Sequence, residues 1–335
     1  MSSSKPGRIN IILMKCLLTV LMAVLLLPAG VFAGGRRQST EADGRTFYFA
    51  VDDSIYRMNS KTGSRKLIKK FGKPYYISNV NYHNGYLYFS GNYYKGSDTD
   101  ETYICRVKTD GTGFKKLDSG YFPRVYNGRI YYIRSKITRD SYNVPLPKKT
   151  GVASMTLSGT GKKTIIAFSS QNAYSRGLAI IGGRLFYTLS GNLYSASLTG
   201  EPKKSFGKCE SFVTDGAAIW YQDSSYIYKV TCGGTKTKLF ARHKKNGSPV
   251  TSLLCVKYGS LYLCDQVYSG TSKFWKYDLT AKKTTAINSF NVVGMSFGSA
   301  NYIVVYRYLG NGNLCAARLT TSGKSYQVIQ KYFRS

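Results

Sequence analysis

Short runs of apolar and aromatic residues recur along most of the chain, each after a turn that contains glycine. Seven runs can be read from the sequence: Phe47-Tyr48-Phe49, Leu87-Tyr88-Phe89, Ile130-Tyr131-Tyr132, Leu185-Phe186-Tyr187, Ile219-Trp220-Tyr221, Leu261-Tyr262-Leu263 and Ile303-Val304-Val305. Their first members lie 34 to 55 residues apart. Such a period indicates one structural unit that is repeated along the chain.

A second short apolar run follows each first run and leads into a polar turn, such as Thr62-Gly63 or Asp110-Gly111. The second runs are Ile55-Tyr56-Arg57-Met58, Ile104-Cys105-Arg106-Val107, Val152-Ala153-Ser154-Met155, Leu193-Tyr194-Ser195-Ala196, Ile227-Tyr228-Lys229-Val230, Phe274-Trp275-Lys276-Tyr277 and Leu314-Cys315-Ala316-Ala317. Both kinds of run are rich in β-branched and aromatic residues, and pairs such as Asn84-Gly85 close tight hairpins. After the N-terminal leader, no stretch has a sustained helical period. The pattern therefore predicts strands.

Four strands joined by these turns make one small sheet, which cannot bury both of its faces alone. Sheets of this size can stack around an axis, and a period of about 40 to 50 residues matches the blades of a β-propeller. We predict an all-β fold, a β-propeller of seven blades with four antiparallel strands each; six or eight blades stay open. Residues 36–44 are polar and make a poor inner strand, whereas the last repeat is complete to Ile329. We expect the two termini to share one blade.

The first 33 residues have the three parts of an export signal: a basic stretch to Lys15, an apolar run over 17–27, and small residues before Val31-Phe32-Ala33. The apolar run is shorter than the about 20 residues of a membrane span, so we predict cleavage after Ala33, with a retained anchor as the alternative. The predicted organisation is a signal peptide at 1–33, an N-terminal segment at 34–43 and the propeller at 44–335. The expected location is extracytoplasmic, secreted or associated with the cell envelope, with no later transmembrane span.

Aromatic pairs in the first runs carry a resemblance to a known group. Ile130-Tyr131-Tyr132-Ile133 and Leu87-Tyr88-Phe89-Ser90 look like the repeats of secreted bacterial β-propellers that form a domain family of unknown function, related to the low-density-lipoprotein-receptor-related type of propeller. Trp220-Tyr221-Gln222-Asp223 comes nearest to the Tyr-Trp-Thr-Asp signature of that type and departs from it at the middle positions. The resemblance covers about residues 44–330. It implies the propeller architecture and no catalytic residues.

Strand order assigns the connections to the two faces of the predicted disc. In an antiparallel meander, the turns after the first and third strands share one face, and the other connections share the opposite face. The tight glycine turns fall on the first of these faces. The longer connections, Gly91 to Glu101, Arg134 to Thr150 and Asp265 to Ser272, fall on the second. Insertions on one face of a repeat array typically mark a binding surface, although drift in tolerant loops gives the same pattern.

The connection from Arg134 to Thr150 is basic and is stiffened by two prolines. Guanidinium and ammonium groups pair with phosphate or sulfate, and tyrosine can stack beside them, so this connection suits a polyanion. The predicted binding residues are Arg134, Lys136, Arg139, Tyr142, Lys148 and Lys149, with Tyr93 and Tyr94 of the preceding long connection. Asp98, Asp100 and Glu101 lie beside these tyrosines but lack the spacing and the glycine of a calcium loop, so we predict no metal site.

The chain has 48 Lys and Arg against 16 Asp and Glu, a net charge of +32 at pH 7. Many lysines fall in the predicted outer strands and the turns before them, for example Lys115-Lys116 and Lys162-Lys163. Lysines discourage an exposed edge from pairing with other chains, which explains part of this pattern. The surplus predicts salt-sensitive attraction to an anionic cell-wall polymer, anionic lipid or sulfated glycan. A protein partner stays open, and the compartment disfavours nucleic acid.

Tyrosines and cysteines in or near the runs have structural explanations. The tyrosines expected to pack between blades are Tyr48, Tyr88, Tyr131, Tyr132, Tyr187 and Tyr221. The cysteines that could form disulfides outside the cytoplasm are Cys209 with Cys232 and Cys255 with Cys264. Spacing alone does not fix the pairing of these cysteines.

Catalytic chemistry has little support in the sequence. His83 and His243 stand beside turns without a companion for a triad or a metal site, and no cofactor motif is complete. A propeller lyase or glycoside hydrolase would need two carboxyl groups about 5 to 10 Å apart. The candidates are Asp52, Asp53, Asp98, Asp100, Asp223 and Asp265, and no pair stands out. We hypothesise an exported noncatalytic propeller that acts as a binding or scaffold module at the cell envelope without a cofactor, with the lyase or hydrolase as the alternative.

Overall fold

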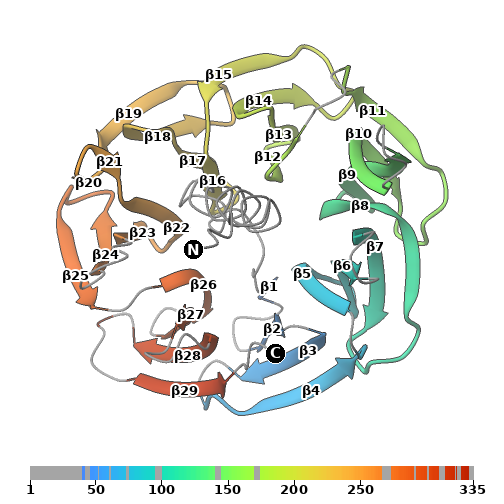
Figure 1. Ribbon diagram of the computed structural model, residues 1–335, viewed down its shortest axis with the longest axis horizontal. Coiled ribbons are helices and arrows are strands. Elements are labelled where there is room, and N and C mark those ends of the chain that lie inside the picture. Colours follow the sequence, from blue (N-terminus) through green and yellow to red (C-terminus); the bar gives the residue numbers. More distant parts are fainter. Residues whose placement is uncertain are drawn as a thin grey trace, which may run out of the picture.

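The apolar runs form β-strands that assemble into small antiparallel sheets around a central axis (Figure 1). The computed structural model describes residues 40–41, 46–51, 53–59, 62–72, 75–94, 100–139, 145–169, 174–265, 273–289, 292–299, 302–308, 314–320, 322 and 326–331. Within these ranges all regular structure is strand. The all-β propeller fold predicted from the sequence is therefore confirmed.

Most sheets contain four strands in sequence order. The first is β1 (Thr40–Glu41), β2 (Thr46–Val51), β3 (Ser54–Asn59) and β4 (Arg65–Lys70). Later sheets are β12 (Leu178–Ile181), β13 (Arg184–Leu189), β14 (Asn192–Ser197) and β15 (Lys204–Lys208); β16 (Ser211–Thr214), β17 (Ala218–Gln222), β18 (Tyr226–Thr231) and β19 (Lys236–Ala241); β22 (Thr251–Lys257), β23 (Ser260–Asp265), β24 (Lys273–Asp278) and β25 (Thr284–Asn288). The last is β26 (Val292–Ser299), β27 (Tyr302–Tyr308), β28 (Leu314–Thr320) and β29 (Tyr326–Lys331).

A seven-stranded sheet lies between the first and the next four-stranded sheet. Its strands are β5 (Tyr75–His83), β6 (Tyr86–Tyr94), β7 (Asp100–Lys108), β8 (Lys115–Tyr126), β9 (Arg129–Arg139), β10 (Pro145–Thr156) and β11 (Lys163–Ala167). The first part of β8 pairs with β7 and the second part with β9, so β8 closes one four-strand unit and opens the next. A separate hairpin consists of β20 (Lys244–Lys245) and β21 (Ser248–Pro249). The four-strand repeat is as predicted, while the total of seven blades stays a prediction.

The two ends of the chain contribute to different sheets. The short strand β1 pairs with β2, with Thr40 opposite Tyr48. It is the first strand of the first sheet, so that sheet consists of four consecutive strands. The C-terminal strand β29 pairs with β28 in the last sheet. The expectation that the termini share one blade is therefore wrong, because two residues of the polar N-terminal stretch suffice for the inner strand.

Side chains of the apolar runs fill the spaces between neighbouring units. Tyr48 of β2 and Phe89 of β6 belong to one core cluster, and Phe186 of β13 and Tyr221 of β17 belong to another. The six tyrosines predicted to pack between blades are all buried. Removing a large apolar side chain from water contributes roughly 1.5–3 kcal/mol. Stacking between units therefore stabilises the ring.

Glycines in turns between third and fourth strands let neighbouring units approach closely. Gly111 has a φ of 90°, and a Cβ there would lie 2.3 Å from the carbonyl oxygen of Ile68 in β4. Gly200 repeats this arrangement at 2.4 Å from the carbonyl oxygen of Ile165 in β11. Glycine accepts both the positive φ and the contact, so these turns fit against the outer strand of the preceding unit.

The cysteines that could have paired are thiols. Cys209 is buried, whereas Cys232 is exposed in the turn after β18. Cys255 faces Tyr262 across the ladder between β22 and β23, and Cys264 faces Ser252. Neither of the two possible disulfides is therefore present. Burial raises the pKa of the Cys255 thiol to about 12, which keeps it protonated at neutral pH.

Candidate functional site

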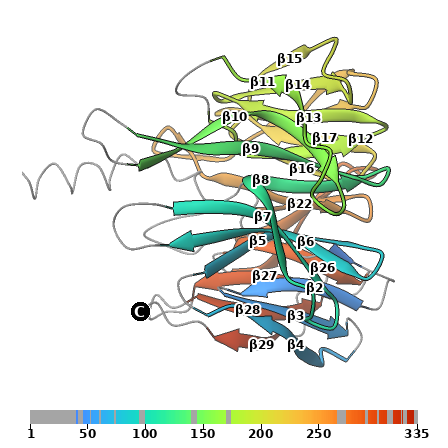
Figure 2. The same ribbon diagram turned by 90° about the vertical axis from the view of Figure 1, so that its right-hand side faces the viewer.

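Two hairpins project from the face that carries the connections between second and third strands (Figure 2). Strands β9 and β10 pair out to Arg139 opposite Pro145, so most of the predicted loop is ladder. Strands β6 and β7 likewise pair out to Tyr94 opposite Asp100. The expectation of open loops is wrong over these residues, because the ladder satisfies backbone groups that an open loop would leave to water.

Arg134 is held in a cluster at the base of the β9–β10 hairpin. Its Nε lies 3.2 Å from Oδ2 of Asp118, and its Nη2 donates to the hydroxyl of Tyr132 at 3.0 Å. Lys162 reaches the other oxygen of Asp118 at 2.9 Å, and the Tyr132 hydroxyl also donates to this carboxylate. Burial raises the pKa of Asp118, but the hydrogen bonds from Tyr132 and Lys162 outweigh it and leave the pKa below its ordinary value. The charge of Arg134 is thus partly neutralised inside the protein.

The predicted lysines of the same hairpin differ in their surroundings. Lys149 donates to the carbonyl oxygen of Ser175 at 2.7 Å, and its Nζ lies 5.1 Å from the ring centre of Tyr121. This contact ties the hairpin to the segment before β12. Lys136 and Lys148 are direct partners across the ladder; Lys136 is exposed and Lys148 is half-buried. Two like charges directly opposite each other cost stability.

Of the remaining predicted residues, the structure describes some in full, some by their backbone alone and some not at all. The ring of Tyr93 is half-buried on β6, 5.4 Å from Nζ of Lys116. Tyr94 and Arg139 end their strands, but their side chains lie outside the described part. Tyr142, Asp52 and Asp98 lie outside the described residues. The structure therefore brings Arg134, Lys136, Lys148 and Lys149 onto one hairpin and places Tyr93 and Tyr94 on the other.

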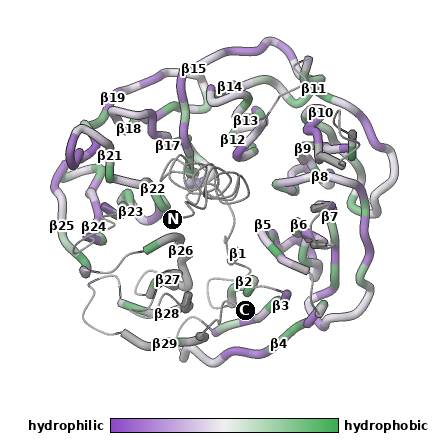
Figure 3. The backbone as a smooth tube through the Cα atoms, viewed as in Figure 1, coloured by the Kyte–Doolittle hydropathy of each residue, from purple (hydrophilic) through white to green (hydrophobic). Residues whose placement is uncertain are grey.

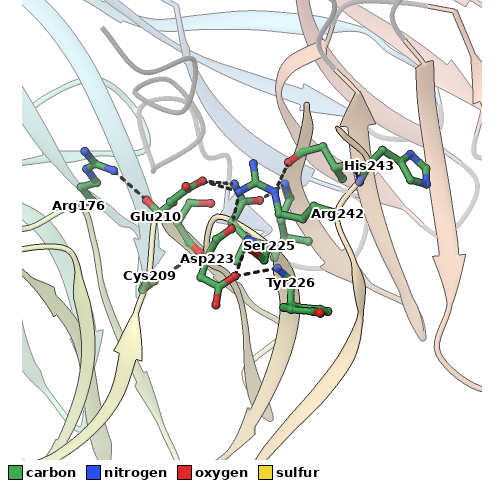
Figure 4. A network of polar contacts seen from close by, with 12 residues as sticks. Arg176, Cys209, Glu210, Asp223, Ser225, Tyr226, Arg242 and His243 are labelled. Atoms are coloured by element: carbon green, nitrogen blue, oxygen red, sulfur yellow. Dashed lines mark hydrogen bonds and ion pairs between the residues drawn. The ribbon is translucent and has the colours of Figure 1, made fainter. Parts of the chain in front are cut away.

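A buried polar network links three sheets on the face that also carries the connections between successive units (Figure 4). Its centre is Arg242, which follows β19 and is 6% exposed. The guanidinium donates to Oε2 of Glu210 at 2.6 Å and to the carbonyl oxygen of Thr251 at 2.8 Å. It also donates to the carbonyl oxygen of Asp223. The planar group thus joins residues from two neighbouring units, a use that suits its fixed fork of donors.

Gln222 and Arg176 extend this network to both sides. The amide oxygen of Gln222, which is fully buried, accepts the backbone N–H of Leu253 at 2.6 Å. The backbone N–H of Glu210 donates to the carbonyl oxygen of Gln222 at 2.8 Å. Arg176, before β12, donates to the carbonyl oxygen of Glu210 at 3.3 Å. The network therefore fastens the sheets that begin with β12, β16 and β22 to one another.

His243 has a partner that the sequence interpretation missed. Its Nδ1 lies 2.7 Å from Oδ2 of Asp265, and Oδ1 of Asp265 accepts the hydroxyl of Thr251 at 2.7 Å. The side chain of His243 is 58% exposed, whereas that of Asp265 is 8% exposed. The imidazole also stacks on Trp275, with ring centres 5.1 Å apart. This contact could not be seen in the sequence, because Asp265 comes from the end of β23 in the next sheet.

The candidate acids on this face act as acceptors in local structure. Oδ1 of Asp223 accepts the backbone N–H groups of Ser225 and Tyr226, both at 2.7 Å. Asp265 accepts from Thr251 and contacts His243. No cluster of three His, Cys, Asp or Glu suited to a metal was found among the described residues. These contacts fix turns and sheet junctions. They also place the partly exposed imidazole of His243 beside the buried carboxylate of Asp265.

The outer strands carry a second set of charged residues. Exposed lysines stand on consecutive outer strands: Lys66 on β4, Lys115 on β8, Lys163 on β11, Lys208 on β15 and Lys238 on β19. These strands follow one another around the circumference, and in Figure 3 hydrophilic segments alternate with hydrophobic ones along them. Nζ of Lys238 lies 4.3 Å from the ring centre of Tyr226. We call these five lysines the rim lysines.

Comparison with known proteins identifies the fold but no family. No protein-family model and no curated protein matches the sequence. Solved structures do match. A puromycin hydrolase mutant in complex with PGG has a TM-score of 0.61 at 10% identity, covering 92% of this chain and 56% of that chain. A structure from a study of two prolyl endopeptidases has a TM-score of 0.59 at 11% identity, covering 97% of this chain and 55% of that one.

The chain thus spans about half the length of the peptidase chains that it matches. The structure of a nidogen–laminin complex also matches, with 14% sequence identity and a TM-score of 0.45. This match covers 65% of this chain and 83% of that chain. The protein is a β-propeller by its sheets, and the likeness to the peptidases is one of fold. Within the described part of the chain, no helix has the length and apolar character to cross a membrane.

Proposed function

We propose that this propeller is exported and acts as a noncatalytic binding or scaffold module at the cell envelope, and that its partner is an anionic polymer. The observation that carries the proposal is the balance of 48 Lys and Arg against 16 Asp and Glu. If every carboxylate were paired with one cation, two thirds of the cations would still lack such a partner. A surplus of this size attracts polyanions and releases their counterions on binding.

Export is part of the proposal and rests on the sequence of residues 1–33, which lie outside the described residues. The resemblance to secreted bacterial propellers supports the same location. In that compartment the abundant polyanions are wall polymers and sulfated glycans. A protein with an acidic surface is the alternative partner.

The predicted cations of the β9–β10 hairpin give the binding role less support than the charge balance does. The like charges of Lys136 and Lys148 repel each other across the ladder, and Arg134 and Lys149 have contacts inside the protein that hold the hairpin in place. The hydrolase or lyase alternative requires an acid that can donate a proton. Asp223 and Asp265 instead accept hydrogen bonds from backbone or hydroxyl donors, which favours binding over acid catalysis on this face.

The test is retention of the protein, expressed from its full-length sequence, on immobilised wall polymer at salt concentrations from roughly 0.05 to 1 M. Retention that falls steeply with salt, without release of polymer fragments, supports the proposal. Fragmentation that disappears in Asp223→Asn or Asp265→Asn variants would support the enzyme alternative. Absence of retention at low salt contradicts the binding proposal.

A further inference from the structure

The outer strands are almost free of acidic residues. Strands β4, β11, β15, β19 and β25 contain no Asp or Glu between their bounds. The acid on β8, Asp118, is already paired with Arg134 and Lys162. The rim therefore presents charge of one sign over several consecutive units.

Protection of strand edges does not explain this single sign. Lysine on an outer strand does prevent pairing with another chain. A mixture of lysine and glutamate would give the same protection with less repulsion between neighbouring charges, because self-repulsion destabilises a compact protein. Cross-strand pairs add to this cost: Arg57 stands opposite Lys66, and Arg106 stands opposite Lys115.

Several ammonium groups of the outer strands rest on aromatic rings from the adjacent third strand. Nζ of Lys238 lies 4.3 Å from the ring centre of Tyr226. Nζ of Lys236 lies 4.3 Å from that of Tyr228 and also donates to the carbonyl oxygen of Phe206 at 2.8 Å. Lys116 repeats the arrangement on Tyr103 at 4.1 Å. A cation held over a ring is favourable by about 0.5–1 kcal/mol at exposed sites. Such a cation also loses less side-chain freedom when it binds a ligand.

We infer that the rim lysines form the binding surface for the polyanion, and that a linear polymer with phosphate or sulfate groups lies along the outer strands across several blades. This inference rests on the proposed function. A small anion would contact one blade at a time, whereas a polymer gains from each successive unit because its later contacts are intramolecular. The rim rather than the projecting hairpins is then the main contact surface.

A matched pair of variants separates the two surfaces. Lys208→Gln with Lys238→Gln removes two charges from the rim, and Lys136→Gln with Lys148→Gln removes two from the β9–β10 hairpin. Binding of long-chain inorganic polyphosphate, dextran sulfate and tripolyphosphate is measured over a salt series with the full chain. The midpoint of urea unfolding of each variant shows that the fold is retained.

The rim pair is expected to reduce the magnitude of the slope of log K against log salt by about 1.4–1.8 for both long polymers, which corresponds to the loss of two charge contacts. The hairpin pair should leave that slope unchanged, and tripolyphosphate should bind far more weakly than the long polymers. Equal losses in both variants would mean that net charge alone acts, and a loss in the hairpin variant alone would place the site there; either outcome overturns the inference. Failure of the unmodified protein to bind any probe would instead overturn the proposed function.

Discussion

The projecting face and the outer rim use positive charge in different ways. On the face, Arg242 is buried against Glu210, and on the inner part of β8 Arg124 donates to the carbonyl oxygen of Leu178 in the next sheet at 2.8 Å. On the rim, Lys66, Lys163 and Lys208 are exposed on outer strands without acids. The difference teaches that a large net charge does not locate a binding surface. What matters is whether each cation has an acceptor within the protein; among the rim lysines, Lys115 has one, the carbonyl oxygen of Ser158 at 3.5 Å.

Arginine and lysine divide these roles for a physical reason. A guanidinium donates in several fixed directions and keeps its charge when buried, so it can join carbonyl groups of neighbouring sheets. Burial lowers the pKa of Arg124 to about 10, which still leaves it charged at neutral pH. Lysine instead lies along apolar surface and leaves its ammonium in water. The face therefore joins neighbouring sheets, while the exposed lysines of the rim keep their ammonium groups in water.

The largest expected effect is the loss of stability when the buried guanidinium of Arg242 is removed. Arg242→Met leaves the Glu210 carboxylate and the carbonyl oxygens of Thr251 and Asp223 without this donor. Breaking a buried pair in this way costs about 3–5 kcal/mol, and the partial exposure of Glu210 favours the lower end. Urea unfolding measures the change, with the exposed Lys245→Gln as the control. Equal stability of the two variants would contradict the role of the face as a structural junction.

The next largest effect is expected from the close contact between the turn at Gly111 and the outer strand of the preceding unit. Gly111→Ala puts a Cβ 2.3 Å from the carbonyl oxygen of Ile68, whereas Gly216 has a similar φ of 93° and open space around it. Both alanines are strained by the positive φ, so the difference in unfolding free energy between them reports the contact. We expect Gly111→Ala to be less stable than Gly216→Ala by about 1–3 kcal/mol. A difference near zero would mean that the turn does not lock the neighbouring unit.

The smallest effect is the pH dependence of the cluster around Asp118. Because its pKa lies below the ordinary value in the folded protein, its contribution is present above the unfolded pKa of about 3.9 and is lost as pH falls through the folded pKa. The stability difference between the unmodified protein and Asp118→Asn should therefore shrink between pH 6 and pH 2. The chain becomes more positive in acid, so the comparison is made between the two proteins at each pH. A constant difference would contradict the pairing of Asp118 with Arg134 and Lys162.

The repeated runs made the fold predictable from the sequence. Phe47, Leu87 and Ile130 begin the predicted segments that the structure places in β2, β6 and β9. A short continuous apolar run is a local property of the sequence, so a buried strand such as β2 can be predicted without knowledge of its partner strands. The inner strand β1 was harder to predict, because two residues carry little pattern of their own.

The candidate site was less predictable because its contacts join distant parts of the chain. His243 and Asp265 are brought together by the register of β22 and β23, which no local spacing reveals. One usable signal was present. Arg176 and Glu210 stand just before the first strand of a sheet, and Arg242 directly follows the outer strand β19, so polar residues recur in the connections between units. The acceptors of Arg134 and Lys149 lie on a neighbouring strand and a neighbouring segment, so the sequence does not reveal these contacts.

The most direct test of the division between face and rim is a footprint of lysine reactivity. The full chain is acetylated at low extent with and without long-chain polyphosphate, and modification at each lysine is measured by mass spectrometry. Protection of Lys163, Lys208 and Lys238, with unchanged modification of Lys136 and Lys148, is the predicted result. Protection confined to Lys136 and Lys148, with the rim lysines unchanged, would contradict it.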